Sequence, residues 1–203
     1  KVAGNDFSKI QGRFATRLSL SSSSVDEVIK RRVLDKKDSA REMLKDEYEQ
    51  QSSVLKNLFT FEDSQGDLKG YAGPVDFEQS YPFVNYQFKI MPNVLAEIRK
   101  HGYSGKHLAS GERSMLSGFQ EAAQQLQDSD TTALVPLWRF YDTITTFLEH
   151  GITQVFSRSG AAVRDNAGLL PQDVEVLKTL YLIRYIPDIK RQHRDPHDRR
   201  YER

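Results

Sequence analysis

The sequence predicts a mainly α-helical protein with one short strand near its N-terminus. Apolar residues recur at helical spacing through most of the 203-residue chain. Strand-like alternation of polar and apolar residues is confined to "TRLSL", Thr16 to Leu20. The breaks between the periodic segments are rich in Gly, Pro, Asp and Ser, which commonly end helices. No internal repeat is evident.

The composition excludes several classes of protein. Hydrophobic residues make up 38% of the chain, enough for a modest core, and charged residues make up 28%. Because 29 Lys and Arg residues balance 28 Asp and Glu residues, no overall field draws the chain to nucleic acid or to a membrane. The absence of cysteine excludes disulfides, thiolate nucleophiles and cysteine-bound metal. No apolar run is long enough to cross a membrane, so no transmembrane helix is expected. The lack of cysteine fits the cytoplasmic location that we expect.

The first predicted helical region follows the strand and a run of serines. Ser24 and Glu27 have capping-box spacing, in which a hydroxyl and a carboxylate satisfy each other's backbone amides at a helix start. An apolar stripe then runs to Val33 and continues weakly to Phe61, which predicts one long helix or two. Residues 62–80 are rich in Gly, Asp and Ser and predict a long loop inserted between helices.

The middle of the chain predicts two more helices. One follows Pro82, and Pro92 within it predicts a kink or a division in two. A loop over residues 102–110 ends at Ser110, a plausible N-cap for the next helix. The apolar positions of that helix recur at core-facing spacing. These positions are Met115, Leu116, Phe119, Ala122, Ala123 and Leu126.

Three helical stretches complete the pattern, over residues 134–151, 152–165 and 171–186. Pro171 suits the first turn of the last helix, and Pro187 ends it. Residues 191–203, "RQHRDPHDRRYER", have no hydrophobic period. They are open to three interpretations: a disordered end, a basic tail that binds phosphates, or the product of a frameshift.

A complete phosphate-binding loop is missing. The pattern G-x-x-x-x-G-K-[ST] lets backbone amides hold the phosphates and a hydroxyl hold the metal. Around the Gly105-Lys106 pair, Lys100 stands where the first Gly belongs and His107 where Ser or Thr belongs. We therefore expect no ATP hydrolysis by this chain alone. No metal site is expected either, because Pro196 interrupts the helical spacing of His193 and His197.

Two arginines are the stronger candidates for a functional site. A guanidinium group is permanently charged and forks onto phosphate oxygens. Arg13 stands just before the predicted strand, and Arg113 falls in the first turn of a predicted helix. A cation in that turn opposes the helix dipole, which favours a partner anion. Ordinary surface arginines are the alternative.

Several motifs together resemble a known family. "GRFATRLSLSSSSVDEVIKRRVL", "YPFVNYQF", "SGKHLASGERSML", "FQEAA" and "VEVLKTLYLIRYIPDIK" occur in this order between about residues 5 and 190. They resemble the large P-loop ATPase of bacteriophage-exclusion (BREX) defence systems, the BrxC/PglY family. The resemblance implies an internal fragment that lacks the Walker motifs and begins at an internal cut, because the chain opens without Met.

The resemblance implies roles for particular residues. The chain is similar to the second half of an AAA+-type module, in which an Arg-Phe pair before the last core strand reaches a neighbouring subunit's nucleotide. Arg13 with Phe14 matches that arrangement. "GERSML" matches a lid helix whose sensor arginine, here Arg113, faces the phosphates, with Glu112 and Ser114 beside the nucleotide. ATP and Mg²⁺ would be held by the complete protein and not by this fragment alone.

The resemblance also implies a division of the chain. Residues 1–24 would end the ATPase core, and residues 25–130 would form a helical lid-like region containing the 62–80 insertion. Residues 131–190 would form a helical, winged-helix-like domain ahead of the 191–203 tail. Other BREX proteins, further copies of the chain and, through the complex, DNA are the expected partners. No membrane is expected.

A different class of function stays open: a non-catalytic helical module that binds DNA or a partner protein of the defence complex. The aromatic-rich stretch with Trp138, Phe140, Tyr141 and Phe147 has helical spacing, which favours a core over a contact surface. A DNA reader needs a basic stripe. The charges near the last helix that could form one are Lys178, Arg184, Lys190 and Arg191.

Overall fold

Helices account for most of the chain that the computed structural model describes, which is residues 22–61, 68–101, 111–129, 133–184 and 186. Within these ranges there is no strand, and the prediction of a mainly α protein is confirmed. The predicted strand at Thr16 to Leu20 lies outside the described residues. The elements are α2 (Ser22–Arg32), α3 (Asp38–Leu58), α4 (Pro74–Ser80), α5 (Asn85–His101), α6 (Gly111–Gln124), α7 (Arg139–Ile144), the 3-10 helix η1 (Thr145–Phe147), α8 (His150–Arg164) and α9 (Pro171–Ile183).

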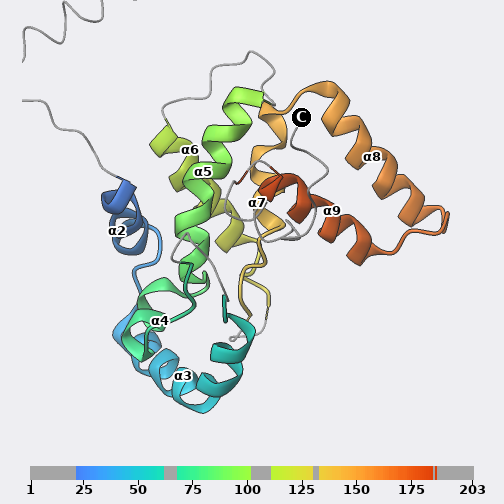
Figure 1. Cartoon of the computed structure of the whole chain (residues 1–203). Helices are drawn as coiled ribbons and strands as arrows, with labels where there is room; N and C mark the ends of the chain where they lie inside the picture. Colours follow the sequence, from blue (N-terminus) through green and yellow to red (C-terminus); the bar gives the residue numbers. More distant parts are fainter. Residues whose placement is uncertain (1–21, 62–67, 102–110, 130–132, 185, 187–203) are drawn as a thin grey trace, which may run out of the picture.

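The helices form a centre with two attached helix pairs (Figure 1). Helix α6 packs against α5, α7 and α2. Helices α3 and α4 pack on each other at one end of the molecule, and α8 and α9 form a hairpin that joins the centre through α7. The longest central helix, α5, runs from the α3–α4 end toward the opposite end (Figure 1).

Four phenylalanines form the middle of the larger hydrophobic core. Phe83, Phe119 and Phe140 are each at most 1% exposed, and Phe88 is 3% exposed. The Phe119 ring stacks on Phe88 at 4.9 Å between centroids and meets the edges of Phe83 and Phe140 at 4.7 and 4.8 Å. Such geometries add to the stabilisation that burial of the rings provides. The core therefore ties α5, α6 and α7 together at one point.

The core-facing positions predicted for α6 are confirmed. Met115, Phe119 and Ala122 are buried, and Leu116, Ala123 and Leu126 pack against the same cluster. The interpretation of the aromatic stretch as core is also confirmed for Phe140 and Tyr141, which are buried.

A buried amide lies beside this aromatic core. Gln87 is 0% exposed; its side chain accepts a hydrogen bond from the Val84 backbone N–H at 3.0 Å and donates one to the Val135 carbonyl oxygen at 2.7 Å. The Val135 backbone N–H in turn donates to the Pro82 carbonyl oxygen at 2.9 Å. These bonds fix the extended segment before α7 against the start of α5.

Several predicted boundaries were wrong in detail. The 62–80 segment is not a loop throughout, because Pro74–Ser80 forms α4 with Pro74 in its first turn. Phe77 on α4 is buried against Tyr48 of α3, and this packing stabilises a helix too short to be recognised from periodicity. Residues 62–67 lie outside the described part of the chain.

The other differences concern helix starts and proline. Ser24 is the third residue of α2, so it is not the N-cap that the capping-box spacing predicted. Pro92 lies inside α5 and does not divide it. The stretch predicted as helical from residue 134 begins with a non-helical segment, and α7 starts at Arg139. The position predicted for Pro171 is confirmed, because Pro171 opens α9.

The apolar side chains of the α8–α9 hairpin are only partly buried by the rest of the described chain. No residue of α8 is fully buried, although Phe156 packs against Tyr141 and Tyr181 at centroid distances of 4.1 and 5.6 Å. The turn between the helices contains Asn166 and Gly168, both with positive φ. Large apolar side chains remain exposed on the hairpin. They are Val155, Leu169, Leu170, Val176 and Leu180.

Candidate functional site

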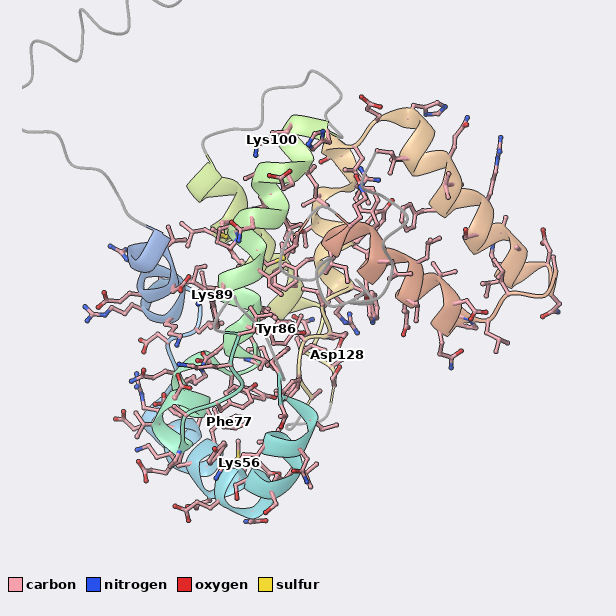
Figure 2. The ribbon with its side chains drawn as sticks, viewed as in Figure 1. Lys56, Phe77, Tyr86, Lys89, Lys100 and Asp128 are labelled. Carbon is pink, nitrogen blue, oxygen red and sulfur yellow. The ribbon has the colours of Figure 1, made fainter. Side chains whose placement is uncertain are left out.

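A pocket of about 580 Å³ lies between α2, α4 with the segment before it, and α5. Figure 2 labels Tyr86 and Lys89, which belong to the α5 side of this pocket. Its walls combine cationic, amide, acidic and aromatic side chains. The lining residues are Asp26, Lys30, Lys69, Asp76, Asn85, Tyr86, Phe88, Lys89, Pro92 and Asn93. We refer to it below as the α2–α5 pocket.

The Lys30 ammonium group occupies a fixed place in this pocket. Lys30 Nζ lies 3.5 Å from Asp76 Oδ1 and 3.4 Å from Asn85 Oδ1, and 5.3 Å from the centroid of the Phe88 ring. Side-chain exposure is 23% for both Lys30 and Asp76. An ion pair with limited exposure is less screened by water than a surface pair. Lys30 therefore presents a positioned positive charge.

Asp76 and Asn85 organise the backbone around that charge. Asp76 Oδ2 accepts hydrogen bonds from the Ala72 backbone N–H at 2.8 Å and from the Asn85 side-chain amide. The same amide also donates to the Gly70 carbonyl oxygen at 3.0 Å, and Asn85 Oδ1 accepts a bond from the Ser80 hydroxyl at 2.9 Å. The network connects α2, α4, α5 and the segment between α3 and α4.

The charges in the α2–α5 pocket are unequal. Lys30, Lys69 and Lys89 face two carboxyl groups, those of Asp26 and Asp76. Burial raises the pKa of Asp26 above its usual value, and the nearby Lys30 opposes this shift. The lining side chains carry charges of both signs, and each of the three lysines has an interaction partner.

A second polar cluster lies next to the pocket, between α2, α3 and α4. The buried Glu78 carboxylate, 4% exposed, accepts a bond from Arg41 at 3.2 Å, and Arg41 also pairs with Asp35 at 2.6 Å. Lys36 donates to the Leu34 carbonyl oxygen at 2.6 Å. Burial lowers the pKa of Lys36 to about 8, although Glu78 acts in the opposite direction. The cluster connects helix ends, and its charges are matched within it.

The residues predicted from the family resemblance stand elsewhere in the chain. Glu112, Arg113 and Ser114 are consecutive in the first turn of α6, and the positions of their side chains lie outside the described part of the structure. Arg13 lies outside the described residues altogether.

The basic residues near the last helix do not form an open stripe where they are described. Lys178 donates to Asp142 at 2.7 Å, and its ammonium lies 5.1 Å from the centroid of the Trp138 ring. The Arg184 guanidinium lies 4.0 Å from the centroid of the Tyr181 ring. Lys190 and Arg191 lie outside the described residues.

Sequence reasoning missed the α2–α5 pocket. Asp26 and Lys30 are one helical turn apart, and so are Tyr86 and Lys89, so the spacing alone places each pair on one helix face. No such signal connects Lys69 to these helices, because it belongs to a segment predicted as an inserted loop.

Comparisons with known proteins add no assignment. No protein-family model matches the chain, and no solved structure matches it. Within the described ranges, no group of three or more His, Cys, Asp or Glu side chains could hold a metal ion. No helix in that part of the chain is both long enough and apolar enough to span a bilayer.

Proposed function

We propose that this chain is the helical, lid-like part of a BREX-type P-loop ATPase that couples ATP binding and hydrolysis to conformational change. Arg113 senses the phosphates in its own subunit, with Glu112 and Ser114 beside the nucleotide. Arg13 completes the site of a neighbouring subunit in a homo-oligomer. The phosphate-binding loop and the Mg²⁺ ligands belong to a segment upstream of this chain, and other BREX proteins and DNA are partners of the complete protein.

The observation that carries the proposal is the ordered series of motifs from "GRFATRLSL" to "VEVLKTLYLIRYIPDIK". The mainly helical fold is compatible with a lid and a helical domain. We also propose that the lid is of the AAA+ type, that the C-terminal helices form a winged-helix-like domain, and that the protein is cytoplasmic.

The position of α6 supports the role given to Arg113. Two residues after Arg113, Met115 enters the core, and Phe119 and Ala122 follow on the same face. Buried side chains fix this part of α6 in the core, and a phosphate-sensing guanidinium requires a helix with a defined position. Helix α6 contacts α5, α7 and α2, so a shift of α6 would reach three other helices.

The experiment that tests this class of function adds the upstream coding segment to the chain. We expect the extended protein to hydrolyse ATP in the presence of Mg²⁺, whereas the 203-residue chain alone does not. An upstream segment without a Walker loop, or an extended protein that neither binds nor hydrolyses ATP, would contradict the proposal.

A second candidate is a non-catalytic module that binds a partner protein of the defence complex. The exposed apolar side chains of Val155, Val176 and Leu180, each more than half exposed, favour it. Binding of DNA by this region is less favoured, because Lys178 and Arg184 pack on aromatic rings.

If the hairpin binds a partner protein, a V176S/L180S variant of the complete protein loses phage protection and keeps ATP hydrolysis. A titration of duplex DNA binding against salt concentration tests the DNA alternative, because binding to DNA phosphates weakens steeply as salt rises.

A further inference from the structure

We propose that the α8–α9 hairpin binds the same hairpin of a second copy of this chain, with α8 of each copy packed on α9 of the other. The inference rests on the docking role of the hairpin, the second candidate function above, and names the partner. Its evidence is the apolar surface on both sides of α9, a stripe of matching spacing on α8, and the opposite charges of the two stripes.

Helix α9 carries apolar side chains on opposite sides. Tyr181 and Leu182 are 7% and 3% exposed and belong to the larger core. Val176 and Leu180, one turn apart on the other side, are 57% and 55% exposed. A helix that is apolar around its whole circumference is normally buried on all sides. The exposed side of α9 therefore suits contact with a further protein surface.

Helix α8 has an exposed stripe with the same spacing. Val155 is 52% exposed, and Arg158, one turn later, is also exposed. Gly151 and Ala162 extend the stripe at its two ends, because residues four, three and four positions apart lie on one helix face. These two small residues leave room for larger side chains from a facing helix.

The residues that attach the hairpin to α7 are not part of either stripe. Phe156 of α8 contacts the Tyr141 ring of α7 at 4.1 Å between centroids, and Tyr181 of α9 contacts the same ring at 5.6 Å. A second copy can therefore contact both stripes while the hairpin stays attached to α7. Figure 1 shows the hairpin on the side of the molecule away from α2.

The two stripes carry opposite charges. Asp173 is exposed and lies one turn before Val176 on α9, whereas Arg158 lies one turn after Val155 on α8. Neither charge forms an ion pair with another described residue. When antiparallel helices bring Val155 against the partner's Val176, Arg158 comes next to the partner's Asp173.

Charge therefore favours α8 on α9 over two copies of the same helix on each other, which would bring together charges of one sign. A two-fold dimer makes the contact between Arg158 and the partner's Asp173 twice. The same hairpin supplies both halves of the interface, so no other protein is required.

Sedimentation equilibrium of the 203-residue chain tests the proposal. Because each stripe presents few side chains, we expect a weak dimer with a Kd on the order of 100 µM, and a monomer at low micromolar concentration. A chain that stays monomeric at about 1 mM would overturn the proposal. If that monomeric chain also loses phage protection through V176S/L180S in the complete protein, the hairpin binds a different protein and its docking role stands.

Variants on and off the stripes separate this contact from other self-association. L180D should weaken the dimer at least about tenfold, because it places a charge among apolar side chains. The matched control is R164E, since Arg164 is exposed and lies on the opposite side of α8 from Val155. An unchanged affinity in L180D, or an equal loss in R164E, would overturn the assignment.

Exchanged charges give a result that misfolding cannot imitate. R158E and D173R should each stay monomeric where the wild type dimerises, because like charges then meet twice. An equimolar mixture of the two should dimerise about as well as the wild type, because the changed positions attract each other. D173N, which keeps an oxygen acceptor for the Leu170 N–H, should weaken the dimer several-fold. A mixture that stays monomeric, or an unchanged affinity in D173N, would overturn the pairing of α8 with α9.

Discussion

The centre of the molecule and the α8–α9 hairpin have similar sequence patterns. They differ in how completely other residues of this chain bury their apolar side chains. Helix α5 buries Phe88, Val94 and Ile98 to 3% exposure or less, whereas α8 buries no residue completely. Both segments carry apolar residues at helical spacing. An amphipathic pattern therefore tells that a helix has an apolar face, and not whether the covering surface belongs to the same chain.

The largest effect is expected at the aromatic centre. F119A should lower the free energy of unfolding by about 3–5 kcal/mol, because it leaves a cavity among Phe83, Phe88 and Phe140. Urea denaturation followed by circular dichroism measures this loss. A loss below about 1 kcal/mol would contradict the view that α5, α6 and α7 are tied together at Phe119.

A buried polar residue in the same centre gives the next largest effect. Q87L should cost about 2 kcal/mol, because the Val84 N–H and the Val135 carbonyl oxygen lose a partner inside the core. The control is Q120L, which places the same new side chain at an exposed position of α6. Equal stabilities for Q87L and Q120L would show that the amide is dispensable.

Beside α3 and α4, in contrast to the aromatic centre, burial affects a charged side chain, that of Lys36. Burial lowers the pKa of Lys36 from 10.5 to about 8. Between these two pH values the unfolded chain binds the proton that the folded chain has lost, so the stability contributed by this site rises with pH. Below pH 8 Lys36 is a buried cation in the folded state, and this increase in stability is absent.

We expect the stability of the wild type relative to K36M to increase by on the order of 1 kcal/mol from pH 8 to pH 10.5, after allowance for partial solvent screening. Using the difference between the two proteins removes the contributions of all other titrating groups, because both proteins share them. K37M, at an exposed neighbour of Lys36, should show no such trend. A flat difference for K36M would mean that Lys36 is hydrated.

The smallest effect is expected on the hairpin. V155S and L180S should each change the free energy of unfolding by less than about 0.5 kcal/mol, because both side chains are more than half exposed. The same urea titration measures it. A loss of about 2 kcal/mol in either variant would show that the hairpin is covered within this chain, and the contrast with α5 would disappear.

The sequence was sufficient for the helices that bury a long apolar stripe. Met115, Phe119 and Ala122 were predicted to face the core from their spacing alone, and they do. Pro171 marked the start of α9 because a missing N–H costs nothing in a first turn. The seven-residue α4 could not be recognised, since the packing of Phe77 on Tyr48 connects residues far apart in the chain.

The α2–α5 pocket was beyond sequence reasoning for a related reason. Its lysines and carboxyl groups come from four segments, which are α2, the residues before α4, α4 itself and α5, whereas local periodicity reports only neighbours within one helix. Pro92 predicted a kink or a division of this helix; α5 is not divided, because the surrounding buried residues Met91, Val94 and Leu95 keep it continuous. For Arg13 and Arg113 the family resemblance supplied roles that spacing could not.

The central claim is that α6 carries a phosphate-sensing arginine, and ATP turnover in the extended protein tests it most directly. We predict that R113A lowers kcat by about 10³-fold or more, as loss of an arginine that stabilises phosphoryl transfer does. R164A, at an exposed position of α8, should leave turnover unchanged. Full turnover by a correctly folded R113A protein would contradict the claim.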